Sequence, residues 1–129
     1  MLLSLSAHAQ ERSTTIEVQH LQRSFLYHFP ENHPAAQALP LVFVLHGGGS
    51  EARSMPRFTG MDTIADREKF IVVYPQGYHH HWNDGRQHIN ENVDDIAFFQ
   101  AMITYFKDHY PIDPHRIYAT GISNGGFMV

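Results

Sequence analysis

The stretch Ile117–Val129, with the sequence IYATGISNGGFMV, decides the fold. It begins with a short apolar run, Ile117–Thr120, passes through the glycine-flanked pentapeptide Gly121–Gly125, and ends in residues that can start a helix. A residue on so sharp a turn takes a strained backbone conformation. Only glycine, which lacks a Cβ, fits the crowded positions on either side. The stretch therefore predicts a buried strand, a tight turn with Ser123 at its apex, and a helix.

The pentapeptide has the G-x-S-x-G form of a nucleophile elbow, which requires this strand–turn–helix context. A helix that starts after Ser123 directs free N–H groups and its positive dipole end toward the hydroxyl. Negative charge that develops during attack on an ester would be stabilised there. We therefore predict that Ser123 is a catalytic nucleophile. The alternative is an ordinary glycine-rich turn.

A second glycine-rich segment, His46–Gly49, follows the buried run Leu41–Leu45. Backbone N–H groups in such a loop can approach a substrate carbonyl because no side chains intervene. We predict an oxyanion hole formed by the N–H groups of Asn124, Gly47, Gly48 and Gly49. The alternative is a flexible turn or a phosphate-binding loop, but a P-loop would continue Gly-Lys-Ser/Thr, whereas Ser50 and Glu51 follow here.

Buried strands alternate with helical patterns along the rest of the chain, which predicts an α/β protein with a mostly parallel sheet. The expected strands are Thr14–Gln19, Arg23–Phe29, Leu41–Leu45, Phe70–Tyr74 and Ile117–Thr120, and the expected helices are Met61–Lys69 and Val93–Tyr110. The first two strands alternate in polarity and are predicted to form an antiparallel edge.

The second helix shows a clear apolar face, spaced at three and four residues. That face comprises Ile96, Phe99, Ile103, Phe106 and Tyr110. Asn92, Asp94 and Asp95 supply capping oxygens and negative charge at its start, as the helix dipole favours. We therefore assign the two aspartates to helix capping.

Composition narrows the functional class. The chain has 129 residues, 43% of them hydrophobic, so it can bury a core, and its length favours one domain. Its formal net charge of −4 argues against nucleic-acid binding, and no apolar run is long enough to span a membrane. It contains no cysteine, which excludes a thiol nucleophile. No cofactor is implied.

The first nine residues resemble the end of a secretory signal peptide. A leucine-rich run precedes Ala7-His8-Ala9, which has the A-x-A form that signal peptidase accepts. A simple N-terminal tail is the alternative. We expect residues 1–9 to be a signal-peptide remnant and the mature protein to be periplasmic or extracellular.

Several blocks together resemble the secreted polyhydroxybutyrate-depolymerase-like and feruloyl-esterase-like serine esterases of the α/β-hydrolase superfamily. The blocks are Pro40–Gly49, Ala65–Glu68, Tyr74–Gly77, Trp82–Arg86, Val93–Ile96 and Asp113–Gly126. The resemblance implies a three-layer α/β-hydrolase that cleaves polyester, feruloyl, acetyl or alkyl esters. It matches Ser123 to the nucleophile and His46 to a residue that holds the oxyanion loop rather than to the base. It places Trp82, Asn83 and His46 near the substrate cleft. The alternative for the Trp82-Asn83 segment is a buried tryptophan that anchors the loop.

The chain departs from this family at its end. The triad order in this fold is Ser, then Asp or Glu, then His, yet the six residues after Ser123 include no acid and no histidine. We therefore expect residues 10–129 to be the N-terminal part of a single esterase domain, truncated after the nucleophile elbow. Without a base the serine is a weak nucleophile, so we expect poor turnover. The strand Ile117–Thr120 should also be left as an unpaired sheet edge.

Histidine is abundant, with 11 residues, and three of them are consecutive at His79–His81. Imidazole binds zinc, copper and nickel, so the alternative function is a non-catalytic periplasmic metal-binding module that uses this loop. Adjacent histidines on a loop point in different directions, which favours a solvated loop instead, and we assign no metal site.

Overall fold

The computed structural model describes residues 11–129, so the predicted signal-peptide remnant lies outside the described residues. The strands are β1 (Arg12–Val18), β2 (Leu21–His28), β3 (Leu39–Leu45), β4 (Ile71–Pro75) and β5 (Ile112–Gly121). The helices are η1 (Ala52–Ser54), α1 (Met55–Thr59), α2 (Met61–Glu68), α3 (Asp95–His109) and α4 (Asn124–Met128), of which η1 is a single 3₁₀ turn. Every strand and helix predicted from the sequence is therefore present, with ends shifted by a few residues.

The strands of residues 11–129 form one sheet in the order β1-β2-β4-β3-β5. β3 runs parallel to both β4 and β5, whereas the β1–β2 and β2–β4 pairs are antiparallel. The predicted antiparallel edge is confirmed. The sheet of residues 11–129 is consequently mixed, whereas the sequence predicted a mostly parallel one. Its parallel part consists of the three strands that lead toward the glycine-rich loops and the serine turn.

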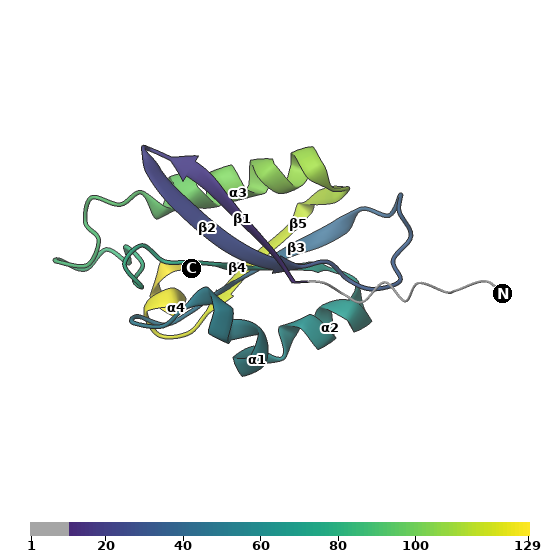
Figure 1. The fold of residues 1–129 in the computed structure, drawn as a ribbon, viewed down its shortest axis with the longest axis horizontal. Helices are drawn as coiled ribbons and strands as arrows, with labels where there is room; N and C mark the ends of the chain where they lie inside the picture. The colour runs from purple at the N-terminus through teal and green to yellow at the C-terminus, as the bar shows by residue number, and fades with distance from the viewer. Residues whose placement is uncertain (1–10) are drawn as a thin grey trace.

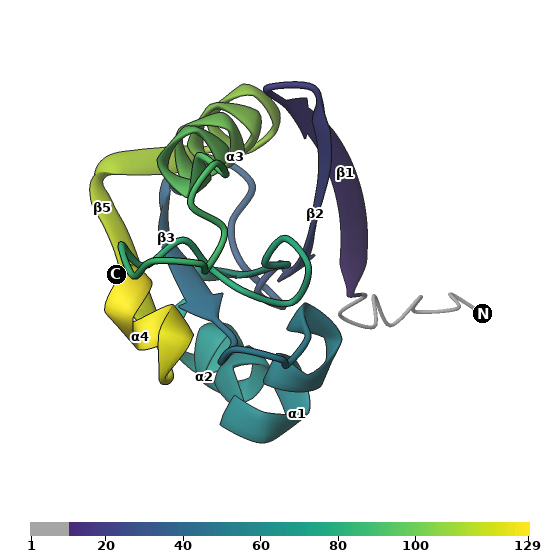
Figure 2. The same ribbon diagram turned by 90° about the vertical axis from the view of Figure 1, so that its left-hand side faces the viewer.

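Helices cover both faces of this sheet, with α3 on one side and α1 and α2 on the other (Figures 1 and 2). The alternation of side chains along the buried strands explains the arrangement. On β4, Ile71 and Val73 pack in the core beneath α3, whereas Val72 and Tyr74 pack in the core beneath α1 and α2. Because β3 and β4 each supply side chains to both cores, the sequence of each is a continuous apolar run. The three-layer architecture follows from this pattern.

Helix α3 buries a stripe that coincides only in part with the expected one. Phe106 of the expected face is fully buried, together with Phe98 and Met102, which were not expected there. The expected residues Phe99, Ile103 and Tyr110 are partly buried and pack against the same core. Ile96 is the exception, at 59% exposed. The helix is apolar on two neighbouring stripes, and the periodicity alone does not decide which one faces the sheet. Asp95 also belongs to the buried stripe, where it meets a partner from β2 that the sequence pattern does not reveal.

Strand β5 lies at the edge of the sheet, with only β3 beside it among residues 11–129. Much of the strand is exposed, including Tyr118 at 54%, so the prediction of a buried strand at Ile117–Thr120 is wrong for the described residues. An edge strand whose outer side no further strand of residues 11–129 covers keeps most of its side chains in solvent. The unpaired edge predicted from the sequence is thus present. Among the helices of residues 11–129, none is both long and apolar enough to cross a bilayer.

Candidate active site

Ser123 lies at the turn between β5 and α4, the position that the sequence predicts. Its backbone angles are φ 52° and ψ −121°, a conformation in which a residue with a Cβ is strained. The next residue, Asn124, begins α4. The first N–H groups of a helix have no partner within it, so the Asn124 N–H is free of helical bonding beside the serine.

Two glycines make this turn sterically feasible. A Cβ on Gly121 would lie 2.5 Å from the carbonyl carbon of Gly125. A Cβ on Gly125 would lie 2.7 Å from the Leu45 carbonyl oxygen and would also collide with that of His46. These neighbours are backbone atoms that cannot rotate away. Gly121 is therefore required by close contact within the turn itself, and Gly125 by contact between the turn and the end of β3.

The glycine-rich loop lies directly beside the serine turn. The Ile122 N–H donates to the Leu45 carbonyl at 3.2 Å, which joins the two segments. A Cβ on Gly47 would lie 3.7 Å from the Ser123 Cβ, and one on Gly48 would lie 3.3 Å from the Asn124 Cβ. The structure therefore brings together the predicted nucleophile and the Gly47–Gly48 part of the predicted oxyanion loop.

Gly49 is placed differently. Its N–H donates to the carbonyl of His80 at 2.8 Å, and the Ser50 N–H donates to the Gly47 carbonyl at 3.1 Å. A donor already bonded to a backbone carbonyl is not available to a substrate. Gly49 therefore does not fit the predicted role of oxyanion donor, and it instead fixes the loop to the His79–His81 segment. Gly47 and Gly48 remain the predicted loop donors.

His46 is fully buried, with both ring nitrogens engaged. Its Nε2 accepts from the Gly77 N–H at 2.9 Å, so Nδ1 carries the proton and donates to the Gly47 carbonyl at 2.7 Å. Burial lowers the pKa of His46 below its ordinary value, with the Gly47 hydrogen bond acting in the opposite direction. His46 therefore holds the glycine-rich loop as a neutral, buried ring. It does not line the cleft beside Ser123 that is described below, although the sequence also places it near the substrate cleft.

Trp82 is likewise buried behind the loop, not exposed in a cleft. Its indole N–H donates to the His46 carbonyl at 3.0 Å. The Asn124 side chain accepts from the Trp82 N–H at 2.8 Å and donates to the Trp82 carbonyl at 3.1 Å. It also donates to Asp84 Oδ2 at 2.7 Å. Asn124 thus connects the serine turn to the Trp82 segment.

Arg23 and Asp95 form a buried ion pair that the sequence analysis missed. Arg23 Nη2 lies 2.6 Å from Asp95 Oδ1, and both side chains are at most 2% exposed. The other carboxylate oxygen accepts the Asn83 N–H at 2.7 Å. Asp94 alone caps α3, by accepting the Ala97 N–H at 2.8 Å. The only sequence signal was the presence of two aspartates where one suffices for a cap.

The histidine segment offers no metal centre in the described part of the chain. Among residues 11–129 no group of three or more histidine, cysteine or acidic side chains is placed to hold a metal ion. His80 Nδ1 contacts the Ser50 carbonyl at 3.0 Å, and His81 Nδ1 contacts the His79 carbonyl at 3.0 Å. These contacts order a loop, and nothing in the described residues favours the metal-binding alternative.

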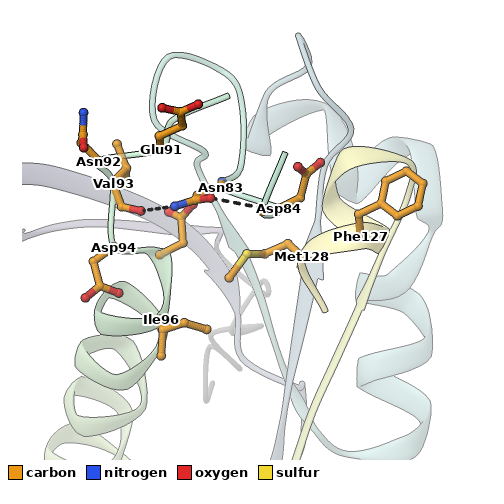
Figure 3. Close-up of a pocket in the computed structure, with 11 residues that line it drawn as sticks. Asn83, Asp84, Glu91, Asn92, Val93, Asp94, Ile96, Phe127 and Met128 are labelled. Atoms are coloured by element: carbon orange, nitrogen blue, oxygen red, sulfur yellow. Dashed lines mark hydrogen bonds between the residues drawn. The ribbon is translucent and has the colours of Figure 1, made fainter. Parts of the chain in front are cut away.

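Two hollows flank the site. A cleft of about 280 Å³ beside Ser123 is lined by Gly47, Gly48, Ser50, Ser54, Met55, Phe58, Ile122 and Ser123. A larger hollow of about 500 Å³ lies between α3 and α4, with Asp84, Glu91 and Asp94 around it. Figure 3 shows Met128 reaching into this hollow from α4, and Asn83 pointing toward Val93, whose carbonyl accepts its amide at 3.0 Å. Asn83 thus lines the larger hollow and not the cleft beside Ser123.

Comparison with known proteins agrees with this geometry. A family model described as esterase PHB depolymerase matches residues 24–129, from β2 to the end of the chain. The chain belongs to this esterase family. The match includes both the glycine-rich loop and the serine turn.

Curated relatives in this esterase family carry ester-hydrolase names. The chain is 32% identical over 108 residues to poly(3-hydroxyalkanoate) depolymerase C of Paucimonas lemoignei, covering 78% of this chain and 25% of the relative. It is 33% identical over 90 residues to the bifunctional acetylxylan esterase/xylanase XynS20E of Neocallimastix patriciarum, covering 69% of this chain and 13% of the relative. It is 32% identical over 92 residues to feruloyl esterase B of Neurospora crassa, covering 68% of this chain and 32% of the relative.

Solved structures agree on the fold. The ferulic acid esterase AmCE1/Fae1A of Anaeromyces mucronatus superposes with a TM-score of 0.68 at 18% identity, over 97% of this chain and 53% of that one. S-formylglutathione hydrolase of Staphylococcus aureus superposes with a TM-score of 0.70 at 17% identity, over 93% of this chain and 50% of that one. The predicted α/β-hydrolase fold is confirmed. This member of the esterase family spans about half of these solved chains and well under half of the curated relatives.

Proposed function

We propose that Ser123 is the nucleophile of a carboxylic ester hydrolase that works through an acyl-enzyme. One observation carries the proposal: the serine stands at the apex of a strained turn, against the N–H of Asn124 and the backbone of Gly47 and Gly48. Family membership supports ester hydrolysis as the reaction class.

In the proposed reaction the Ser123 oxygen adds to the ester carbonyl carbon, and the carbonyl electrons move onto oxygen. The N–H groups of Asn124 and of the Gly47–Gly48 segment stabilise that oxyanion in a preorganised site, which typically contributes a factor of roughly 10²–10³ per donor. Collapse breaks the bond to the alcohol, which leaves with the proton from the serine. Water then adds to the acyl-enzyme, releases the carboxylic acid and restores the hydroxyl.

A general base for this reaction is not found around Ser123 within residues 11–129. No histidine or carboxylate of that part hydrogen-bonds the serine hydroxyl. His46, which begins the glycine-rich loop, has both ring nitrogens occupied. We therefore propose that residues 10–129 form the N-terminal part of one esterase domain, whose acid and base belong to the longer part that the relatives also contain. The 129-residue chain alone should then be poorly active.

The proposed substrates are esters of the kinds named for the relatives: poly(3-hydroxyalkanoate), feruloyl or acetylxylan esters. The A-x-A pattern at Ala7-His8-Ala9 supports export. We propose a periplasmic or extracellular enzyme. N-terminal sequencing of the exported protein tests this directly, because cleavage should follow Ala9, and a retained Met1 would contradict it.

The function is tested by hydrolysis of p-nitrophenyl butyrate by the full-length gene product, with and without a chelator. Ser123→Ala should reduce kcat/KM by at least about 10³-fold, because the covalent step is lost. The chelator should have no effect. Ser13→Ala, on the exposed part of β1, is the matched control and should leave activity unchanged. Activity that survives Ser123→Ala would refute the assignment.

A further inference from the structure

The cleft beside Ser123 has an apolar wall that the reaction itself does not explain. Met55 and Phe58 of α1 face it, together with Ile122 from the serine turn. Phe58 is 66% exposed and Ile122 is 43% exposed, and it is their position in one cleft, not their exposure alone, that is informative. These two exposed apolar side chains come from different elements and line the same cleft as the proposed nucleophile. An apolar group of a ligand bound in the cleft would cover both of them.

The wall is held rigidly by its surroundings. Met55 is 3% exposed and packs in the core beneath α1 and α2. The Ala52 N–H donates to Gln76 Oε1 at 2.9 Å, which fixes the start of η1 to the end of β4. The Thr59 hydroxyl donates to the Met55 carbonyl at 2.7 Å. Phe58 is therefore presented from a preformed short helix, not from a mobile loop.

The polar edge of the cleft lacks free hydroxyl donors apart from Ser123. The Ser54 hydroxyl donates to the Glu51 carbonyl at 2.7 Å. In its 3.3 Å contact with Ser50, the Ser54 oxygen must then accept, so the Ser50 proton is also used. Both oxygens remain as acceptors, which disfavours an anionic group at this edge. A neutral, apolar group is the chemistry that fits.

We propose that Phe58 is a specificity-determining residue, which receives one apolar substituent of a neutral ester while Ser123 and the adjacent backbone hold the carbonyl. This inference rests on the proposed function. The cleft volume of about 280 Å³ lies below the ~300–1,000 Å³ typical of pockets for drug-sized ligands, so the substituent is compact. Offset or edge contact between aromatic rings makes a phenyl group a good occupant.

The test is binding of methyl benzoate to the Ser123→Ala chain, followed by NMR of backbone amides and methionine methyl groups. Because this variant lacks the nucleophile, binding is measured independently of turnover. Shifts should concentrate at Gly47, Gly48, Met55, Phe58 and Ile122. Adding Phe58→Ala should weaken binding about two- to tenfold, the range expected for loss of one aromatic pair. Adding Phe58→Leu instead should give an affinity for methyl benzoate between that of the Ser123→Ala chain and that of the chain that also carries Phe58→Ala.

The control distinguishes this cleft from the larger hollow between α3 and α4. Phe127 is also an exposed phenylalanine, at 72%, but it lines that other hollow with Ile96 and Met128. Adding Phe127→Ala should leave the affinity unchanged. Equal binding by the Phe58→Ala and parent chains, or weakening by Phe127→Ala alone, would overturn the proposal. Circular dichroism and the unfolding midpoint verify that each variant is folded. Binding of methyl benzoate at this cleft, combined with no p-nitrophenyl butyrate hydrolysis by the full-length gene product with Ser123 intact, would refute the proposed function but not the site.

Discussion

The side-chain amide of Asn124 pairs with the backbone of Trp82 as one strand pairs with another: it accepts the Trp82 N–H at 2.8 Å and donates to the Trp82 carbonyl at 3.1 Å. Both residues are at most 3% exposed. Trp82 in turn donates its indole N–H to the His46 carbonyl. The residue that follows the proposed nucleophile is thereby tied to the glycine-rich loop beside it, so side chains set the separation of the proposed oxyanion donors.

Asn124→Ala should destabilise the folded chain by about 2–4 kcal/mol, because it leaves the buried Trp82 N–H and carbonyl without partners. Asn124→Asp should cost more at pH 7, since a carboxylate would face the Trp82 carbonyl and the carboxylate of Asp84. The Arg86 side chain holds the pKa of Asp84 well below its usual range, so Asp84 stays charged. Urea unfolding measures both variants.

A double variant tests whether repulsion from Asp84 causes the extra loss of stability in Asn124→Asp. Combining Asn124→Asp with Asp84→Asn should recover part of the stability, because the like-charge contact is removed. A chain with Asn124→Asp that is as stable as one with Asn124→Ala at pH 7 would show that the amide donor to Asp84 contributes nothing.

The adjacent residues Asp94 and Asp95 should respond very differently to the same substitution. Asp95→Asn should destabilise by about 3–5 kcal/mol, because it leaves the charge of Arg23 buried without its partner. Asp94→Asn should change stability by less than about 0.5 kcal/mol, since asparagine is an equally good helix cap. Urea denaturation at pH 7 compares them, and equal losses would contradict the assignment of separate roles.

The sequence predicted what depends on local patterns. Continuous apolar runs located the strands of the parallel part, and the pentapeptide around Ser123 located the turn, because backbone contact with Leu45 and His46 permits only glycine at Gly125. The three-layer arrangement then follows from alternation along the strands.

Features that depend on tertiary partners were not predictable from the pattern. The role of Asp95 requires Arg23, which is 72 residues earlier in the chain. The side of α3 that is buried depends on how the helix crosses the sheet, so Phe98 and not Ile96 became the core residue. The Gly49 N–H, predicted as an oxyanion donor, is instead bound by the carbonyl of His80, a contact that the local pattern does not show.

His46 should make stability pH-dependent. Burial lowers its pKa from the ordinary value of 6.5, so the folded chain holds a neutral ring that the unfolded chain protonates near that value. Between the two pKa values the unfolded state binds more protons, and stability therefore rises with pH and is lost as the pH falls below about 6.5. One proton gives a slope of up to about 1.4 kcal/mol per pH unit.

His46→Gln removes this titration while keeping an acceptor near the Gly77 N–H. The variant should be less stable than the parent chain at pH 7.5, but its stability should fall less steeply between pH 6.5 and 5. Urea unfolding at several pH values measures the slopes, and the other histidines are common to both chains. Identical slopes would show that His46 takes up its proton without loss of the fold.

The backbone strain at Ser123 should lower the stability of the folded chain, which a comparison of Ser123→Gly with Ser123→Ala can measure. Its angles of φ 52° and ψ −121° suit glycine, and a strained residue of this kind costs of order 1–3 kcal/mol. Ser123→Ala and Ser123→Gly both remove the hydroxyl, but only glycine relieves the strain. After the entropy that glycine adds to the unfolded chain, Ser123→Gly should still be more stable than Ser123→Ala by about 1–2 kcal/mol. At Ser13 on β1, where no such strain occurs, the same comparison should favour alanine by about 0.5–1 kcal/mol. The opposite signs at the two serines, measured by urea unfolding, would identify backbone strain as the cause, whereas alanine favoured at both would show that the turn carries none.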